Sequence, residues 1–311
     1  MNTSSGTGAG LPVDSQGPGI ARISGARVVY WSLRRELWEN RSIHLAPLVV
    51  TAFVLLGSLI AVASLPHRLQ GLASQDPAML HAMAVKPFSM APAPIMLTTF
   101  LVGMFFSLDA LYGERRDRSI LFWKSLPVSD RTTVLTKAAV PLVVLPAIAL
   151  VLSVITQIVM LAVSAPILLG SAVGPAALWR ELRFFEGVAI MFYGLAVHTL
   201  WFAPIYGWFL LVSAWSRRAP FLWATVPLLV ITGFERLALN SWSFGYMLQY
   251  RVSGAMKEAF TWSRGPVGEV DRLWQLEPVR FLRAPGLWVG LLFAAICLVA
   301  AIRLRRNREP I

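Results

Sequence analysis

The chain has 311 residues, of which 56% are hydrophobic and only 14% charged, and its formal net charge is +12. A soluble domain carries about 25% charged residues, so the composition excludes an ordinary soluble fold and indicates an integral membrane protein. The basic excess fits segments retained beside anionic lipid on the cytoplasmic side, because no nucleic-acid-binding motif accompanies it. Cys297 is the single cysteine, which excludes an intrachain disulfide, and it lies in an apolar run. No metal site is predicted.

Two segments precede the first apolar run. Residues 1–19 are rich in Gly, Ser and Pro and predict a disordered tail. Residues 20–43 predict an amphipathic helix in the membrane interface, because Leu33 and Leu37 share one stripe and Arg35 lies opposite. Two tryptophans of this segment suit the headgroup region of a bilayer, Trp31 and Trp38. The alternative is a solvated extension of the first span.

Six apolar runs follow, separated by charged residues. A helix needs about 20 apolar residues to cross a bilayer core of about 30 Å. The run 138–179 is longer than one crossing needs, and its excess near Pro166 to Pro175 predicts an external loop or a re-entrant turn. The run 187–216 contains Pro204 and Gly207 and holds one long kinked helix or a broken pair. We predict an all-α integral membrane protein in which residues 44–311 form six transmembrane helices, approximately 44–66, 88–111, 138–163, 186–215, 219–238 and 285–303.

The basic residues orient these helices. Six spans place both termini on one side of the membrane, and that side carries 17 Lys and Arg residues against 11 on the other. Basic residues are retained in the cytoplasm, so both termini and the segment 112–137 are predicted to be cytoplasmic. The segment 239–284, which contains Trp and Tyr among its charges, then lies outside and predicts short helices packed on the outer membrane surface.

The segment between the second and third spans reads YGERRDRSILFWKSLPVSDRTTVLTK and is rich in charge between two uncharged runs. It predicts an amphipathic helix in which Glu114 precedes Arg118 by four residues, the favourable order for an ion pair. Pro127 ends this helix, because a proline disfavours helical geometry in the residue before it. Ser129 or Asp130 then caps the next helix, which leads into the third span.

An aromatic pair, Phe122 and Trp123, follows the charges of this segment. Arg and Trp are residues that anchor protein interfaces. A solvated loop that obeys the positive-inside rule explains the charges, but it explains neither the aromatic pair nor the proline turn. The segment therefore predicts a docking surface for another protein.

Polar side chains are scarce inside the apolar runs. His198 is a functional candidate because it is ionisable at membrane depth, although a hydrogen-bonded packing residue is the alternative. The aromatic residues near it indicate an apolar path that fits lipid-like, peptide or drug-like cargo. The residues assigned to this path are Phe192, Tyr193, His198 and Trp201.

The stretch ERRDRSILFWKSLPVSDRTTVLTK resembles the cytoplasmic loop between the second and third spans of the ABC-2 type permease family. The acidic–basic start falls on Glu114 to Ser119, the apolar turn on Ile120 to Trp123, the SLPVS motif on Ser125 to Ser129, and the basic helix start on Lys137. The order of elements is also similar, with an interfacial helix, six spans and an extended last external segment.

The resemblance implies that the loop is a coupling helix docked on a separate ATPase subunit. It further implies two permease chains, most simply a homodimer, in an exporter of the bacterial inner membrane. ATP and Mg²⁺ would bind to the ATPase, with no cofactor in this chain. Phe122 and Trp123 would be apolar anchors, and Pro127 would stiffen the loop that transmits movement from the ATPase. The polar docking contacts would be Glu114, Arg115, Arg116, Asp117, Arg118 and Lys124.

The chain has no motif for hydrolysing ATP. A P-loop reads GxxxxGK[ST], and the only Lys followed by Ser or Thr is Lys124, which no glycine closely precedes. HExxH and GxSxG motifs are also missing, so an enzyme is not expected. Two alternatives need no ATPase: a proton-coupled secondary transporter, and a non-transporting membrane scaffold or sensor subunit. Acidic residues near mid-membrane would favour the proton-coupled transporter, and the apolar runs contain none.

Overall fold

The computed structural model describes most of the chain, namely residues 24–71, 86–125, 128–167, 183–261, 270 and 272–307. For residues 65–71 and 123–125 only the backbone is described. Over these ranges the chain is α-helical, with no strand beyond a single antiparallel bridge between Phe260 and Leu276. The predicted disordered tail, residues 1–19, lies outside the described residues.

Six helices in the described part are long and apolar enough to cross a membrane, which confirms the predicted number. Such segments become helical in a bilayer because a helix satisfies every backbone polar group internally, where no water is present to do so. They are α2 (Ser42–Gly71), α4 (Pro92–Asp109) with its flanks, the run of α7 (Asp130–Ala139), η1 (Val140–Val144) and α8 (Leu145–Ile167), then α10 (Phe184–Trp215), α11 (Pro220–Ala238) and α14 (Pro285–Asn307).

Over the described residues, each of the two ambiguous apolar runs contributes one helical span. Helix α10 continues through Pro204 without a break. In the earlier run, η1 is a π-helical turn that contains Pro141, whose missing N–H disrupts the regular hydrogen-bond ladder. Thr199 of α10 donates a hydrogen bond of 2.9 Å from Oγ1 to the Leu142 carbonyl of this turn. Residues 168–182 lie outside the described part.

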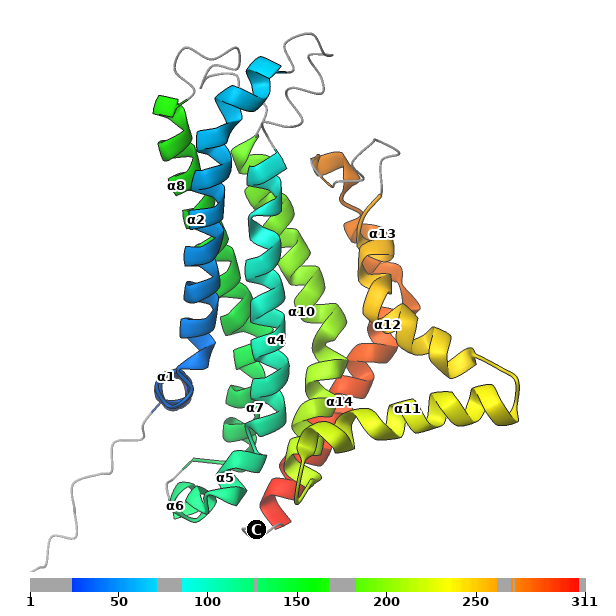
Figure 1. Cartoon of the computed structure of the whole chain (residues 1–311). Coiled ribbons are helices and arrows are strands. Elements are labelled where there is room, and N and C mark those ends of the chain that lie inside the picture. The colour runs from blue at the N-terminus through cyan, green and yellow to red at the C-terminus, as the bar shows by residue number, and fades with distance from the viewer. Residues whose placement is uncertain are drawn as a thin grey trace, which may run out of the picture.

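Helix α10 is the centre of the bundle and packs against α14, α4, α8 and α12 (Figure 1). Trp201 and Leu210 are fully buried along it. Gly207 permits a close approach to α14, because a Cβ at this position would lie 3.2 Å from the Ala294 Cα. Small residues at contacts of this kind let membrane helices pack backbone to backbone.

Helix α11 leaves the bundle at the end where α10 finishes and runs crosswise toward α12 (Figure 1). Only 6% of its apolar window is buried. Among the described residues, its main packing contact is Ala224, which is fully buried against Phe209 and Val212 of α10, so most of its apolar surface is left uncovered. Its exposed apolar side chains include Phe221, Leu222, Trp223, Val226, Leu229, Val230, Ile231, Phe234 and Leu237.

The described part of the segment 239–284 forms α12 (Ser243–Ala259), the short turn η2 (Leu273–Gln275) and α13 (Pro278–Arg283). Helix α12 packs on α10 through Trp201, whose Nε1 donates to the Arg251 carbonyl at 2.8 Å. Arg251 in turn donates to the Trp201 carbonyl at 3.1 Å. This reciprocal pair connects the segment to the central helix.

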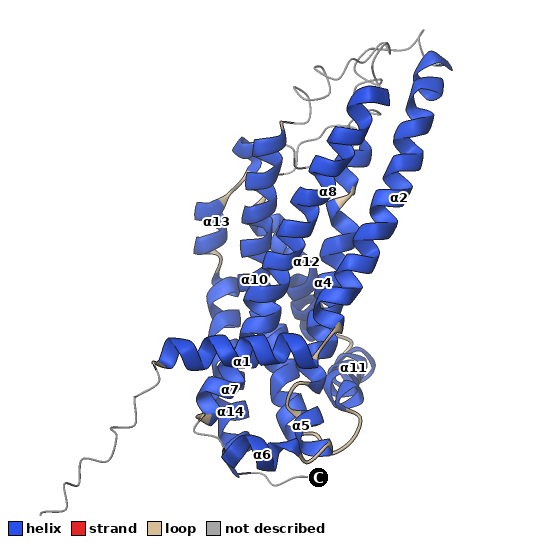
Figure 2. Cartoon of the chain, turned by 90° about the vertical axis from the view of Figure 1, so that its left-hand side faces the viewer, coloured by secondary structure: helices blue, strands red, loops and turns tan. Residues whose placement is uncertain are grey.

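Three short helices gather at one end of the bundle together with the C-terminal end of α14 (Figures 1 and 2). They are α1 (Gly25–Glu39), α5 (Tyr112–Arg116) and α6 (Ser119–Ser125). Helix α1 lies across the bundle, beside the start of α2 (Figure 2). Ser24 caps α1, since its hydroxyl accepts from the Arg27 N–H at 3.4 Å. The two ends of the described chain therefore lie at the same end of the bundle.

Candidate functional site

The segment 112–137 folds as α5, α6 and the first part of α7. A continuous helix up to Pro127, which itself lies outside the described residues, is wrong, because Arg118 interrupts it with a left-handed φ of 56°. This conformation costs a non-glycine residue about 1–2 kcal/mol, so neighbouring contacts must hold the turn. Ser129 is confirmed as the cap of α7, with its hydroxyl accepting from the Thr132 N–H at 3.1 Å.

Lys137 bridges two carboxylates, with Nζ 2.9 Å from Glu36 Oε2 and 3.2 Å from Glu114 Oε1. Arg305 also reaches Glu114, with Nη1 2.6 Å from Oε2, and its Nε lies 3.1 Å from Asp130 Oδ1. Arg35 adds a third positive side chain, with Nη2 2.6 Å from Glu36 Oε1. Together these contacts join α1, α5, α7 and α14 through three positive and three negative side chains. We call this group the charge cluster: Arg35, Glu36, Glu114, Asp130, Lys137 and Arg305.

Most of the charge cluster is buried. The exposed fractions of the Glu36, Lys137 and Arg305 side chains are 1%, 4% and 4%. Desolvating each ion costs several kcal/mol, which the opposite charges offset, so losing a single partner is strongly destabilising. Burial alone would raise the pKa of the Glu36 carboxyl, but Lys137 and Arg35 outweigh it and the pKa lies below the ordinary value. Glu36 is therefore ionised at neutral pH.

Arg115 fastens α5 to the end of α10. Its Nη2 donates to the carbonyls of Ser213 at 2.7 Å and Ser216 at 2.6 Å. The Ser213 hydroxyl accepts from the N–H groups of Leu111 at 3.0 Å and Tyr112 at 2.9 Å. The Ser213 side chain of α10 thus satisfies the backbone at the start of α5, which holds the loop against the bundle.

The outer side of the loop is exposed. Arg116 pairs with Asp117 at 2.9 Å and lies 3.8 Å from Asp109 at the end of α4. On α6, Leu121 and Phe122 are each 60% exposed. Charged and large apolar side chains therefore share the outer surface of the α5–α6 loop.

The predicted docking residues thus divide into two groups. Glu114 and Arg115 point inward and are held by contacts within the chain, and Glu114 does not form the predicted ion pair with Arg118. The exposed group comprises Arg116, Asp117, Arg118 and Phe122. For Trp123 and Lys124 only the helical backbone is described, so their side chains lie outside the described part.

Sequence reasoning missed two members of the charge cluster, Glu36 and Arg305. A signal for Glu36 exists, because this acid lies between Leu33 and Leu37 on the face of α1 that packs inward. A carboxylate within an apolar stripe needs a cationic partner when it is buried. Arg305 has no comparable signal, since it lies in a basic cluster at the end of the last apolar run.

The four residues assigned to a cargo path have different surroundings. Phe192 is 63% exposed, and Tyr193 donates to the Ala259 carbonyl of α12 at 3.2 Å. Trp201 is fully buried against α12. His198 Nε2 lies 3.2 Å from the Tyr206 hydroxyl. The described geometry thus pairs His198 with a neighbour in its own helix and does not bring the four together.

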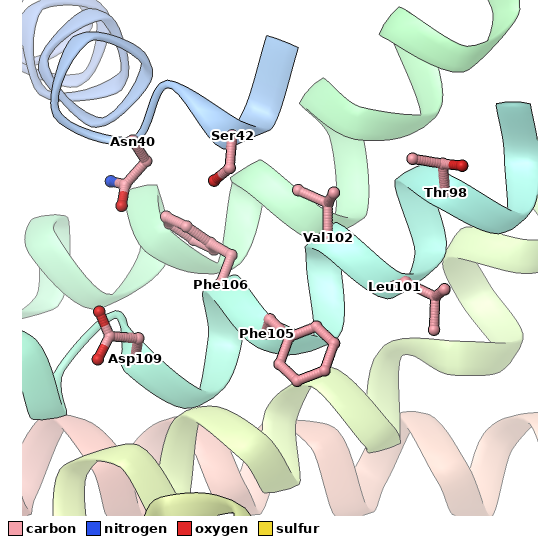
Figure 3. A pocket seen from close by; sticks show the side chains of 8 residues that line it. All are labelled: Asn40, Ser42, Thr98, Leu101, Val102, Phe105, Phe106 and Asp109. Carbon is pink, nitrogen blue, oxygen red and sulfur yellow. The ribbon is translucent and has the colours of Figure 1, made fainter. Parts of the chain in front are cut away.

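Two cavities lie elsewhere in the bundle. One of about 350 Å³ is lined by the junction of α1 and α2 and by α4, with Asn40 and Asp109 near one end of it and Leu101 farther along (Figure 3). The second, of about 230 Å³, is apolar and lies among η1, α10 and α14. Neither is lined by the four residues assigned to a cargo path.

Among the described residues, no group of three or more His, Cys, Asp or Glu side chains is placed to hold a metal ion. The side chains that meet at the α5–α6 end form ion pairs and hydrogen bonds that hold this loop against the bundle. Comparisons of the chain with family models, with curated proteins and with solved structures give no match.

Proposed function

We propose that the chain is the membrane-spanning permease subunit of an ATP-driven exporter of the ABC-2 type, with the ATPase on a separate subunit. The docking site is the exposed side of α5 and α6, which we call the docking surface: Arg116, Asp117, Arg118, Leu121 and Phe122. Two alternatives, a proton-coupled transporter and a non-transporting scaffold or sensor, would not need this surface.

One observation carries the proposal: the loop is exposed on one side and firmly held on the other. Its exposed side combines Arg116 with Leu121 and Phe122, a mixture typical of protein interfaces. Its inner side is joined to α7 and α14 through Glu114 and to α10 through Arg115. A solvated loop needs no such anchors, whereas a loop that transmits movement to the membrane helices does.

In this mechanism the partner subunit binds ATP and Mg²⁺ and moves the loop when it closes. Glu114 passes the displacement to Lys137 at the start of the third span and to Arg305 at the end of the last. Arg115 passes it to α10. The residues of this chain thus orient and transmit, while ATP hydrolysis belongs to the partner.

A second permease chain fits α11, most of whose apolar side chains are left uncovered by the described residues. A homodimer would bury them and bring two docking surfaces to one side of the membrane. The clustering of α1, the loop and the end of α14 at one end of the bundle supports placing both termini in the cytoplasm, in a bacterial inner membrane (Figure 1).

The test is co-purification of the full-length chain with the ATPase encoded nearest to it. We expect the wild-type pair to survive gel filtration, and Phe122→Ala and Arg116→Glu each to release the ATPase. The variants keep the buried anchors, so helicity and elution of the permease should not change.

Matched controls come from the opposite end of the bundle. Phe185→Ala removes a phenyl ring that is 84% exposed, and Arg280→Glu inverts a charge whose side chain is 51% exposed, against 53% for Arg116. Both controls should retain the ATPase. If no ATPase co-purifies, or if the controls and the loop variants behave alike, the proposed function is wrong.

A further inference from the structure

One face of α1 alternates basic and aromatic side chains at i, i+4, i+7 and i+11, the spacing of a single helical stripe. We call it the α1 stripe: Arg27, Trp31, Arg34 and Trp38. Trp31 is 57% and Trp38 69% exposed. The Arg34 guanidinium carbon lies 5.1 Å from the centroid of the Trp31 ring and 4.7 Å from that of Trp38, so the cation is flanked by both indoles.

The opposite face of α1 is fixed to the bundle. Leu33 and Leu37 pack against the apolar cluster around Ile43 and Leu210, and Glu36 enters the charge cluster. Because these contacts set the rotation of the helix, the α1 stripe points away from the bundle.

The stripe carries positive charge without a matching carboxylate. Of the two acids on α1, Glu36 is paired with Lys137 at 2.9 Å, and Glu39 lies 3.7 Å from Arg35. Neither Arg27 nor Arg34 forms an ion pair with a carboxylate of the described residues. Arg34 is half-buried between the two rings, and Arg27 is exposed. Both guanidinium groups carry N–H donors that suit an anionic oxygen group.

We infer that the α1 stripe binds the headgroup of an anionic phospholipid. Helix α1 lies crosswise at the end of the bundle where α2 begins, so it runs parallel to the membrane at the depth of the lipid phosphates (Figure 2). Trp side chains favour this depth, and Arg forms forked hydrogen bonds with phosphate. The inference requires only that the bundle of α2, α4, α8, α10 and α14 is embedded in a bilayer and does not depend on an ATPase.

Two other occupants are less well matched to the stripe. A second copy of the chain would have to bring carboxylates to it, whereas the chain has a formal net charge of +12. A protein partner from the cytoplasm would have to enter the headgroup layer. A bilayer supplies phosphates at this position in any case, and an anionic headgroup adds the charge that the two arginines complement.

The experiment is native mass spectrometry of the full-length chain in detergent, titrated with dioleoylphosphatidylglycerol or with dioleoylphosphatidylcholine. We expect the anionic lipid to bind at least tenfold more tightly. Arg27→Gln with Arg34→Gln should weaken binding of the anionic lipid about 25-fold, about fivefold for each cation removed, and weaken binding of phosphatidylcholine less than that. Trp31→Leu with Trp38→Leu keeps the charge and should weaken both lipids.

The matched control is Arg217→Gln with Arg218→Gln, which removes two exposed arginines at the same end of the bundle without flanking α1. It should leave the preference for the anionic lipid intact. Equal affinity for the two lipids, or an equal effect of the control, would overturn the inference. If glycerol phosphate bound as tightly as the lipid, the stripe would be a site for free phosphate. If Arg27→Gln with Arg34→Gln converted a dimer to a monomer, the occupant of the stripe would be a second copy of the chain. Each of these two results would also overturn the inference.

Discussion

Lys137 and Glu36, 101 positions apart in the chain, form a buried ion pair of 2.9 Å between Nζ and Oε2. The same ammonium lies 3.2 Å from Glu114 Oε1, so one cation holds the N-terminal helix and the α5–α6 loop together. Its position at the start of the third span connects both to the membrane bundle. The stability of this end of the molecule should therefore depend on Lys137.

Lys137→Met should destabilise the chain by about 3–5 kcal/mol, because it leaves two buried carboxylates without their shared cation. Thermal unfolding in detergent, followed by circular dichroism, measures this change. Lys257→Met removes an exposed lysine and should have an effect below about 0.5 kcal/mol. Adding Glu36→Gln to Lys137→Met should recover part of the loss, since it removes one unpaired charge; a strictly additive double variant would contradict the proposed coupling.

Acid should release α1 from the bundle. The pKa of Glu36 lies below its ordinary value because Lys137 and Arg35 outweigh the effect of burial. A lowered acid pKa stabilises the folded state above the unfolded value of about 4.3, and this contribution is lost as the pH falls through the lower folded pKa. Hydrogen exchange of the α1 amides should therefore accelerate as the pH falls below about 4, after correction for the intrinsic rate.

Glu36→Gln should remove most of this acid transition. Glu39→Gln is the control, because burial raises the pKa of Glu39, and a raised acid pKa opposes folding above the unfolded value instead of supporting it. The Glu39 variant should retain the acid transition. If both variants retain it, the ionisation of Glu36 does not hold α1 in place.

Gly207→Leu should separate α10 from α14. A Cβ at this position would lie 3.2 Å from the Ala294 Cα and 3.3 Å from its carbonyl oxygen, both backbone atoms that cannot rotate away. Overpacking of this kind costs about 1–3 kcal/mol. Gly187→Leu, in the same helix, has no heavy atom within 4 Å of the added Cβ and should leave the unfolding midpoint within about 2 °C. Equal midpoints for the two variants would show that the close approach is not required.

Thr199→Val should loosen the π-helical turn of the third span. The change keeps the shape of the side chain but removes the 2.9 Å hydrogen bond to the Leu142 carbonyl. Hydrogen bonds between membrane helices contribute about 0.6 kcal/mol on average, so a loss of about 0.5–1.5 kcal/mol is expected in thermal unfolding. Thr225→Val is the control, because its hydroxyl bonds to Phe221 within its own exposed helix. An equal loss in both variants would mean that the bond between helices adds nothing.

Local sequence was sufficient for the number of helices and for several of their boundaries. The free energy of transferring an apolar run into the bilayer is a sum over its own residues. A helix also forms its backbone hydrogen bonds within itself. Neither the transfer free energy nor these hydrogen bonds depend on contacts with other helices. The cap at Ser129 was equally local, because the hydroxyl reaches an N–H only three residues away. The resemblance to ABC-2 permeases also rests on a short contiguous segment, and it remains a prediction.

The partners of the charged residues could not be read in the same way. Spacing favoured Arg118 for Glu114, four residues along one helix, yet the helix breaks at Arg118 and Glu114 pairs with Lys137 and Arg305. The last of these partners is 191 positions away. Which charges meet depends on where the ends of separate helices assemble, and burial strengthens each contact there.

The sequence by itself determined a chain of six apolar helices with a charged, aromatic loop after the second. The tertiary structure decided which side of that loop is exposed, that α11 leaves the bundle, and that α1 turns Glu36 inward and the α1 stripe outward. The physical reason is the range of the forces: hydropathy and backbone hydrogen bonds act within one turn of the chain, whereas buried ion pairs and helix contacts exist only after distant segments meet.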